Sequence, residues 1–328
     1  MSPSSPSFRI GTRGSALALC QTEWVCEKLR VAGHESFKVE IRTTGDLVQD
    51  VPLSRIGSRA LFTKQIDDAL LEGRIDLAVH SLKDLPTTLP EGIVIAAVAM
   101  REDPSDALVC HRPSTIDHRP VTWDTLPHRA IVATSSLRRR AQLLHVRADL
   151  RVVDLRGNVG TRIAKLDENQ DWTSVILATA GLVRLRLVDR ISQRLPPEVM
   201  LPAPGQGALA VTARKGDESA IAAARSVHHQ PTTLAVRAER AFLGTLEGGC
   251  QVPVAALATV VEGALRLHGR VVTLDGDRAV EGIELGSAAS EGAAEAVGVG
   301  LAERLLDDGA DEILAHVRSQ AAPSVQEP

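Results

Sequence analysis

Short apolar runs alternate with amphipathic stretches from Phe8 to about Ser226 of this 328-residue chain. This alternation is typical of α/β units built around mainly parallel sheets. Strands are expected at 8–12, 38–43, 75–80, 94–99, 107–110, 130–133, 151–154, 175–178 and 208–213. Helices are expected at 16–31, 61–72, 137–148 and 159–167. Because open α/β sheets bind ligands beyond the carboxyl ends of their strands, a binding site is expected where these strands end.

Two polar, proline-interrupted segments, 101–106 and 196–207, divide the alternating region. They are expected to be two crossings between the same pair of domains, since a chain of this length exceeds the size at which one core usually keeps growing. A third unit begins at Gln230-Pro231, where proline suits the first turn of a helix. The expected domains are 8–101 together with 207–227, then 102–206, then 230–320.

The third unit is expected to be a small α+β domain. Three segments of alternating apolar residues run from Val252 to Leu285, with Asp275-Gly276 as a hairpin turn, and a helix follows at about 291–306. Cys250 precedes them in the segment 246–253, where two glycines leave its thiol uncrowded. This placement suggests a covalent attachment point, and a small buried cysteine after a helix cap is the alternative.

Composition argues against several classes of protein. The net charge is −4 and aromatic residues make up 2% of the chain, so neither a basic nucleic-acid surface nor a stacking platform for bases is expected. The four cysteines show no spacing suited to zinc, so no metal site is expected and a reducing compartment fits best. With no leader pattern and no apolar run long enough for a bilayer, the chain is expected to be soluble and cytoplasmic.

Hydroxyl residues and arginines follow the strand expected at 130–133. Residues 134–136 are Thr-Ser-Ser, and Arg138, Arg139 and Arg140 then fall in the first turn of a helix. Cations are disfavoured at the positive end of a helix dipole, so this placement indicates an anion at the helix start. For this segment alone, a solvated basic face is the alternative.

Further arginines follow neighbouring strands. Asn158 is the expected N-cap of a helix that carries Arg162 one turn inside, and Arg184 follows the next strand. Arg13 follows the first strand, with Ser15 as the expected cap. Guanidinium groups suit bidentate binding of carboxylate or phosphate. Because no Walker loop or dinucleotide fingerprint accompanies them, a ligand with several carboxylates is favoured over a nucleotide.

The segment 79–86 closes a buried strand with Asp84, for which the nearby proline predicts an extended, well-defined backbone. A carboxylate facing an arginine-lined cleft could stabilise a cationic intermediate or relay protons. A turn-capping aspartate paired with Lys83 is the alternative, and His80 is expected to be a core or hinge histidine rather than a base. The weakly periodic segment 45–60 is expected to be a mobile lid or loop.

Six motifs in order make the chain resemble the porphobilinogen deaminase family, also called hydroxymethylbilane synthase, from Arg9 to about Ile313. The motifs lie at 12–15, 79–86, 134–139, 155–162, 204–208 and 246–253. The resemblance implies two α/β domains similar to periplasmic binding proteins, joined by two hinges, and a third domain that holds a dipyrromethane cofactor by a thioether to Cys250. It also implies the stepwise condensation of four porphobilinogens, each losing ammonia, into the linear tetrapyrrole hydroxymethylbilane.

The same resemblance assigns residues to roles. It implies that Asp84 lies beside the pyrrole nitrogens, assists deamination and stabilises the positive charge of the coupling intermediate. The residues implied to bind substrate or cofactor carboxylates are Arg13, Ser15, Lys83, Thr134, Ser136, Arg138, Arg139, Arg156, Gly157, Asn158, Arg162 and Arg184. Other residues of the cleft are Gln21, Asp46, Phe62 and Gln206, and the lid carries Arg55 and Arg59, where many relatives have lysines. Arg140 is assigned no role and is expected at the surface.

The resemblance also implies a monomer whose product passes to uroporphyrinogen-III synthase. From the residues alone, two other classes of protein are alternatives, and the sequence gives an argument against each. A two-domain clamshell that captures a small dicarboxylate would explain the arginines and the crossings, but it would need neither the third unit nor Cys250. A nucleotide-dependent enzyme would need a phosphate-binding loop, which the sequence lacks.

Overall fold

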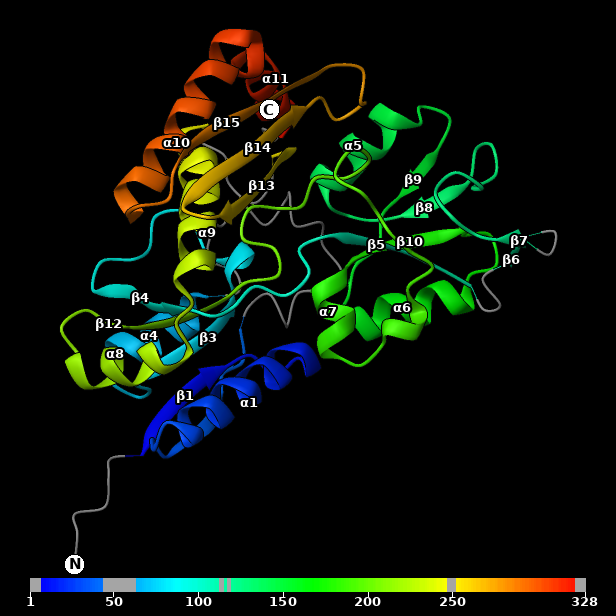
Figure 1. The fold of residues 1–328 in the computed structure, drawn as a ribbon. Helices are drawn as coiled ribbons and strands as arrows, with labels where there is room; N and C mark the ends of the chain where they lie inside the picture. Colours follow the sequence, from blue (N-terminus) through cyan, green and yellow to red (C-terminus); the bar gives the residue numbers. More distant parts are fainter. Residues whose placement is uncertain (1–6, 44–62, 112–114, 117–118, 247–251, 322–328) are drawn as a thin grey trace, which may run out of the picture.

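Two five-stranded sheets and one three-stranded sheet form the frame of the chain in the computed structural model (Figure 1). The structure describes residues 7–43, 63–111, 115–116, 119–246 and 252–321. The first sheet has the strand order β2-β1-β3-β12-β4. The bounds of these strands are Ser36–Glu40, Phe8–Thr12, Leu77–Ser81, Leu209–Arg214 and Ile93–Val98.

The second sheet has the strand order β11-β5-β10-β8-β9. The bounds of these strands are Gln193–Arg194, Asp106–Cys110, Ser174–Ala178, Ile131–Ala133 and Arg151–Val153. A two-stranded ribbon of β6 (Thr115–Ile116) and β7 (Arg119–Pro120) lies beside this unit (Figure 1). Each five-stranded sheet has one strand antiparallel to both of its neighbours, β12 in the first and β5 in the second. The other four strands of each sheet run in one direction. The mainly parallel sheets that the alternating pattern predicts are therefore confirmed.

The chain passes between the two sheets twice. Residues 99–105 lead from β4 to β5, and residues 195–208 lead from β11 back to β12, which inserts between β3 and β4. The two crossings touch, because the Glu102 amide donates to the Gly207 carbonyl at 3.2 Å. Gly207 has a φ of 89°, and a Cβ there would overlap the Glu102 carbonyl oxygen, so only glycine fits. The expected fold class, two α/β units joined by two crossings plus a small C-terminal unit, is confirmed.

Helices pack against both large sheets. Those of the first unit are α1 (Ala16–Val31), α4 (Lys64–Leu71) and α8 (Glu218–Ala224), and those of the second are α5 (Leu137–Val146), α6 (Val159–Glu168) and α7 (Thr179–Arg184). The expected cap of α1 is confirmed, because the Ser15 side chain accepts a hydrogen bond from the Ala18 amide at 3.3 Å. No helix in the described part of the chain is long and apolar enough to cross a membrane.

The C-terminal unit packs its helices against an antiparallel sheet around one shared core (Figure 1). Its elements are α9 (Gln230–Thr245), β13 (Val254–Val261), β14 (Ala264–Val272), β15 (Ala279–Ser287), α10 (Glu291–Leu305) and α11 (Asp311–Ala321). Gly276 has a φ of 82° in the turn between β14 and β15, as the expected hairpin requires. The sequence pattern does not predict α11, which begins after a break at Gly309, where φ is 97°.

Several expected boundaries shift in the structure. The strand expected at 38–43 begins at Ser36 and ends at Glu40. The helix expected at 61–72 is described from Lys64 to Leu71, and residues 61–62 lie outside the described part. The short elements α7, α8 and β11 carry too few residues for a clear period, so the sequence does not predict them.

Glu239 of α9 joins the C-terminal unit to both crossings. Its carboxylate is fully buried and accepts hydrogen bonds from Arg101 Nη1 at 2.6 Å and from the Gly205 amide at 2.6 Å. It also accepts from the Ala258 amide of β13 at 2.7 Å. Arg101 belongs to the first crossing and Gly205 to the second, so one buried carboxylate holds three parts of the chain together.

Replacing Glu239 by alanine is expected to lower the free energy of unfolding by about 3–5 kcal/mol, because the change leaves Arg101 and two buried amides without their acceptor. Urea unfolding followed by circular dichroism measures the loss. The matched control is Glu291→Ala, which removes a half-exposed carboxylate paired with Arg237 and should cost less than about 1 kcal/mol. Equal losses in the two variants would contradict the role given to Glu239.

Candidate functional site

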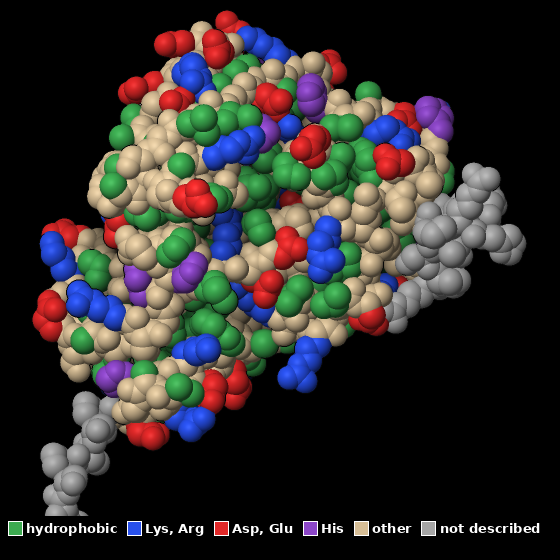
Figure 2. Space-filling view, in the orientation of Figure 1, with side chains coloured by type: hydrophobic (Ala, Val, Ile, Leu, Met, Phe, Trp, Pro, Cys, Tyr) green, Lys and Arg blue, Asp and Glu red, His purple; other side chains and the backbone are tan. Residues whose placement is uncertain are grey.

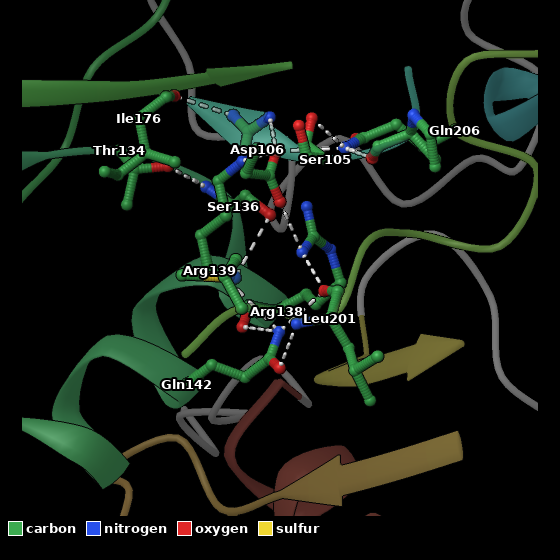
Figure 3. A network of polar contacts seen from close by, with 12 residues as sticks. Ser105, Asp106, Thr134, Ser136, Arg138, Arg139, Gln142, Ile176, Leu201 and Gln206 are labelled. Atoms are coloured by element: carbon green, nitrogen blue, oxygen red, sulfur yellow. Dashed lines mark hydrogen bonds and ion pairs between the residues drawn. The ribbon is translucent and has the colours of Figure 1, made fainter. Parts of the chain in front are cut away.

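Asp106, the first residue of β5, is the centre of a buried polar network (Figure 3). Arg139 donates to Asp106 Oδ1 from Nε at 3.1 Å and from Nη2 at 2.7 Å. Arg138 Nη1 lies 2.8 Å from Asp106 Oδ2. Asp106 is fully buried and each arginine is 5% exposed, so the alternative of a solvated basic face is wrong for this pair.

Backbone carbonyls bind the rest of the two guanidinium groups. Arg139 Nη1 donates to the Ile176 carbonyl at 2.9 Å, and Arg138 Nη1 donates to the Leu201 carbonyl at 2.5 Å. Ser136 caps the same helix, since its hydroxyl accepts from the Arg139 amide at 3.4 Å. Thr134 Oγ1 in turn accepts from the Ser136 amide at 3.3 Å. The orientation of both arginines is therefore set by protein groups.

Two arginines at the start of α5 require a nearby negative charge, because a helix start is the positive end of the helix dipole. Asp106 supplies that charge. Burial alone would raise the pKa of Asp106, but Arg138 and Arg139 outweigh it and hold that pKa well below its usual range. Sequence reasoning missed Asp106, which lies in a segment interpreted only as a crossing. The available signal was an aspartate directly before the apolar run Ala107–Cys110.

Gln206 links this network to the turn that carries Lys83. Its Nε2 donates to Asp106 Oδ1 at 3.0 Å and to the Pro104 carbonyl at 2.7 Å, and its Oε1 accepts from Lys83 Nζ at 3.2 Å. Burial lowers the pKa of Lys83 to about 8, with Arg139 and Arg138 adding to the shift and Asp84 and Asp106 opposing it. Lys83 is therefore a buried amine with two acids and two arginines in its surroundings.

Asp84 ends the short 3₁₀ turn η1 (Leu82–Asp84) that follows β3. The extended backbone expected at Asp84 is wrong: Leu85, which directly precedes Pro86, is the extended residue, with φ −79° and ψ 140°. No hydrogen bond or ion pair to another described residue holds the Asp84 carboxylate, so the alternative of a capping pair with Lys83 is wrong as well. Its charge still acts on Lys83 and Arg162, whose pKa values it raises.

The start of α6 places two more arginines in the same environment. Arg162 Nε donates to the Gly157 carbonyl at 2.7 Å, and burial lowers the pKa of Arg162 to about 10, helped by Arg139 and Arg156. Gly157 has a φ of 123°, which favours glycine. Asn158 is the N-cap, as expected, but its side chain makes no capping hydrogen bond. Arg156 Nη1 is a buried nitrogen without a hydrogen-bond partner in the described structure.

Other predicted residues lie where the two large units meet. Arg184, the last residue of α7, donates from Nη2 to the Gly207 carbonyl at 2.6 Å, and its own carbonyl accepts from Cys20 Sγ at 3.2 Å. Gln21 is buried and hydrogen-bonds Ser81 Oγ at 3.1 Å. Arg13 lies near enough to His80 to lower its pKa.

His80 is buried in β3, with Nε2 placed 3.2 Å from Thr212 Oγ1 of β12. Burial lowers the pKa of His80 to about 4, and Arg13 adds to the shift. The expectation of a core histidine is therefore confirmed. Arg140 is half-buried rather than at the surface, and donates to the Val152 carbonyl at 3.3 Å.

Five predicted site residues, Asp46, Arg55, Arg59, Phe62 and Cys250, lie outside the described residues. Within the described part, no group of His, Cys, Asp and Glu is arranged to hold a metal ion. Figure 2 shows acidic and basic side chains intermixed over the face that it presents. The positive charge described above belongs to buried and half-buried side chains.

This fold and site define an α/β protein of two five-stranded sheets and a small C-terminal unit, with arginines gathered around Asp106 near its crossings. Residues 8–222 match the family model "Porphobilinogen deaminase, dipyromethane cofactor binding domain", and residues 233–307 match "Porphobilinogen deaminase, C-terminal domain". The porphobilinogen deaminase of Moorella thermoacetica is 49% identical over 316 residues, which cover 96% of this chain and 97% of that protein. That of Synechococcus elongatus is 45% identical over 324 residues, 98% of each chain. The chain belongs to the porphobilinogen deaminase family.

Among solved structures, the methionine-binding protein MetQ is similar over 67% of this chain and 88% of that chain, with a TM-score of 0.41 and 12% identity. A periplasmic domain of BvgS from Bordetella pertussis is similar over 67% and 86%, with a TM-score of 0.39. These likenesses are distant, and no functional conclusion rests on them.

Acid is expected to destabilise the protein through His80. Between pH of about 6.5 and about 4 the unfolded chain binds a proton at this position that the folded chain excludes, so stability falls as the pH falls through that window. The slope is about 1.4 kcal/mol per pH unit. Urea unfolding from pH 7 to 4 measures it. His80→Gln should flatten the profile, whereas the exposed control His228→Gln should not, and identical profiles for all three proteins would contradict the prediction.

Proposed function

We propose that this chain joins four porphobilinogen molecules stepwise, with release of ammonia, into the linear tetrapyrrole hydroxymethylbilane, on a dipyrromethane primer bound by a thioether to Cys250. The observation that carries this proposal is the concentration of basic side chains around Asp84. Lys83 is its neighbour in the sequence, and the charge of Asp84 raises the pKa of Arg162. Arg139 lowers the pKa of both Lys83 and Arg162. Family membership supports the same activity.

We propose the domain division 8–101 with 207–227, 102–206, and 230–320. The separate sheets support it, because strand β12 belongs to the first sheet although it follows the strands of the second. The core clusters support it as well: Val211 packs with Ile10 and Val25, whereas Phe242 packs with residues of the C-terminal sheet.

The residues present fit a group that carries several carboxylates. A buried donor without a partner is costly, and Arg156 Nη1 is such a donor. Arg162 has its pKa lowered by burial and by other arginines, and a carboxylate nearby would reverse that shift. Arg156, Arg162 and Lys83 would therefore bind the acetate and propionate groups of cofactor and substrate. Asp106 neutralises one of the two positive charges of Arg138 and Arg139, and the remaining charge would attract a carboxylate.

When bound, dipyrromethane supplies the terminal pyrrole to which the next substrate is added. Asp84 would stabilise the positive charge that develops on the substrate as ammonia leaves, since a fixed carboxylate in a partly buried site acts strongly on a nearby cation. The surrounding arginines would hold the carboxylate groups of the substrate, so that its aminomethyl group faces Asp84. Lys83, bonded to Gln206, would help to position those carboxylates.

A two-domain protein that only captures a dicarboxylate is the alternative. It would explain the arginines, but it would gain nothing from an acid placed among them, because Asp84 repels a carboxylate ligand. Turnover of porphobilinogen with release of ammonia distinguishes the two functions.

We also propose that the protein acts in the cytoplasm as a monomer and passes its product to uroporphyrinogen-III synthase. The composition supports the first part, since the cysteines show no disulfide framework. The proposed product is linear, so its ring closure needs a further enzyme.

The protein purified from cells that make porphobilinogen is expected to exceed its polypeptide mass by that of a linked pyrrole pair. Intact-protein mass spectrometry measures the excess, and Cys250→Ser should abolish it. The matched control is Cys20→Ser, which should leave the excess mass unchanged. The Cys20 thiol donates a hydrogen bond to the Arg184 carbonyl. A wild-type protein of bare polypeptide mass, or a Cys250→Ser protein that keeps the excess, would contradict the attachment.

Asp84→Asn keeps the size of the side chain and removes its charge, so the fold should persist while kcat falls about 10²–10³-fold. Release of ammonia and formation of hydroxymethylbilane measure kcat. Glu91→Gln, which neutralises an exposed acid of the same unit, should behave like the wild type. A wild-type kcat in Asp84→Asn would remove Asp84 from the mechanism.

A further inference from the structure

The position of the Asp84 carboxylate depends on the backbone that carries it. Among the described residues, no hydrogen bond or ion pair holds this carboxylate, although its charge acts on Lys83 and Arg162. A side chain without direct bonds is oriented by its own backbone and by whatever fixes that backbone. Residues that contact the turn after Asp84 therefore control the position of its carboxylate.

Arg240 of α9 binds the carbonyls of three consecutive residues directly after Asp84. Its Nη2 donates to the Pro86 carbonyl at 2.7 Å and to the Thr87 carbonyl at 3.0 Å, and its Nη1 lies 3.5 Å from the Leu85 carbonyl. A guanidinium group is planar and carries its donors in a fixed fork, so it can bind several carbonyls at once in one geometry. Arg240 therefore fixes the path of the backbone that leaves Asp84.

The same face of α9 makes two further contacts with this turn. Val236, one helical turn before Arg240, packs in a buried cluster with Leu82 and Leu85. Gly244, one turn after Arg240, lies beside Thr87: a Cβ on Gly244 would be 3.9 Å from Thr87 Cβ, an ordinary van der Waals distance. Residues spaced by four lie on one side of a helix. One stripe of α9 thus contacts the turn on both sides of Asp84.

The residue before Arg240 holds the opposite side of the turn. Glu239 accepts from the Gly205 amide at 2.6 Å, and a Cβ on Gly205 would lie 3.1 Å from the Leu82 side chain. The Leu82 amide donates to the Ala208 carbonyl at 3.0 Å. Two neighbouring residues of α9 therefore fix the returning crossing and the Asp84 turn relative to each other.

We propose that Arg240 is a positioning residue for Asp84: by binding the carbonyls of residues 85–87 from the C-terminal unit, it holds the Asp84 carboxylate where the substrate reacts. This inference rests on the proposed function. It makes the C-terminal unit part of the catalytic apparatus through Arg240, independently of the cysteine that this unit carries. The guanidinium group of Arg240 donates to backbone carbonyls, so its removal is expected to change kcat rather than KM.

The test is the steady-state kinetics of the holoenzyme with porphobilinogen. Arg240→Ala is expected to lower kcat about 10–100-fold, the size of effect that a displacement of about 1 Å causes, while KM stays within about twofold. Arg240→Lys keeps a cation but cannot span three carbonyls, so it should lose less. The control is Arg237→Ala, on the same helix but paired with Glu291 at the surface, which should match the wild type. Mass spectrometry verifies that every variant carries its cofactor.

A double variant separates positioning from a general loss of stability. If Arg240 acts through Asp84, Arg240→Ala should lower kcat little further in an Asp84→Asn background. A double variant whose loss in kcat is the product of the two single losses would overturn the inference. So would an Arg240→Ala enzyme with wild-type kcat, whether or not its KM is raised. If the alanine variant does not fold, the lysine variant is judged by the same comparison. A wild-type holoenzyme that releases no ammonia would instead contradict the proposed function.

Discussion

The structure depends on one buried carboxylate. Glu239 accepts from Arg101 and Gly205 of the two crossings and from Ala258 of the C-terminal sheet. Such a group is stable in a protein interior only when every lone pair has a donor, and here the donors come from segments far apart in the sequence. Because both crossings meet at this point, Glu239 helps to fix the placement of the three units relative to one another.

The site is built by the same principle. Asp106 lies between Arg138 and Arg139, and Gln206 connects it to Lys83. An arginine pair without a counter-ion would be costly in so buried a place. Asp106 supplies that counter-ion, and together with the Ile176 and Leu201 carbonyls it holds both arginines in fixed orientations.

Much of the fold and of the candidate site could be predicted because the signals are local. Ser15 and Asn158 mark helix starts by residue type, and the strands alternate with helices at recognisable spacing. Arg138 and Arg139 violate the charge preference of a helix start, so an anion could be inferred, but not its source. Asp106 is 32 residues from Arg138 in the sequence, and only sheet formation brings it to the start of α5. The same holds for Arg240, which contacts residues 153–155 positions away along the chain.

The sequence by itself determined the alternation of strands and helices, the positions of the arginines after the strands, and the family to which the chain belongs. These depend on residue type and short-range spacing, which a linear sequence contains in full. Only the tertiary structure decided that Asp106 is the counter-ion of the arginine pair, that Glu239 joins the crossings, and that Arg240 binds the turn after Asp84. Those pairings depend on where distant segments meet, and burial then makes each of them strong.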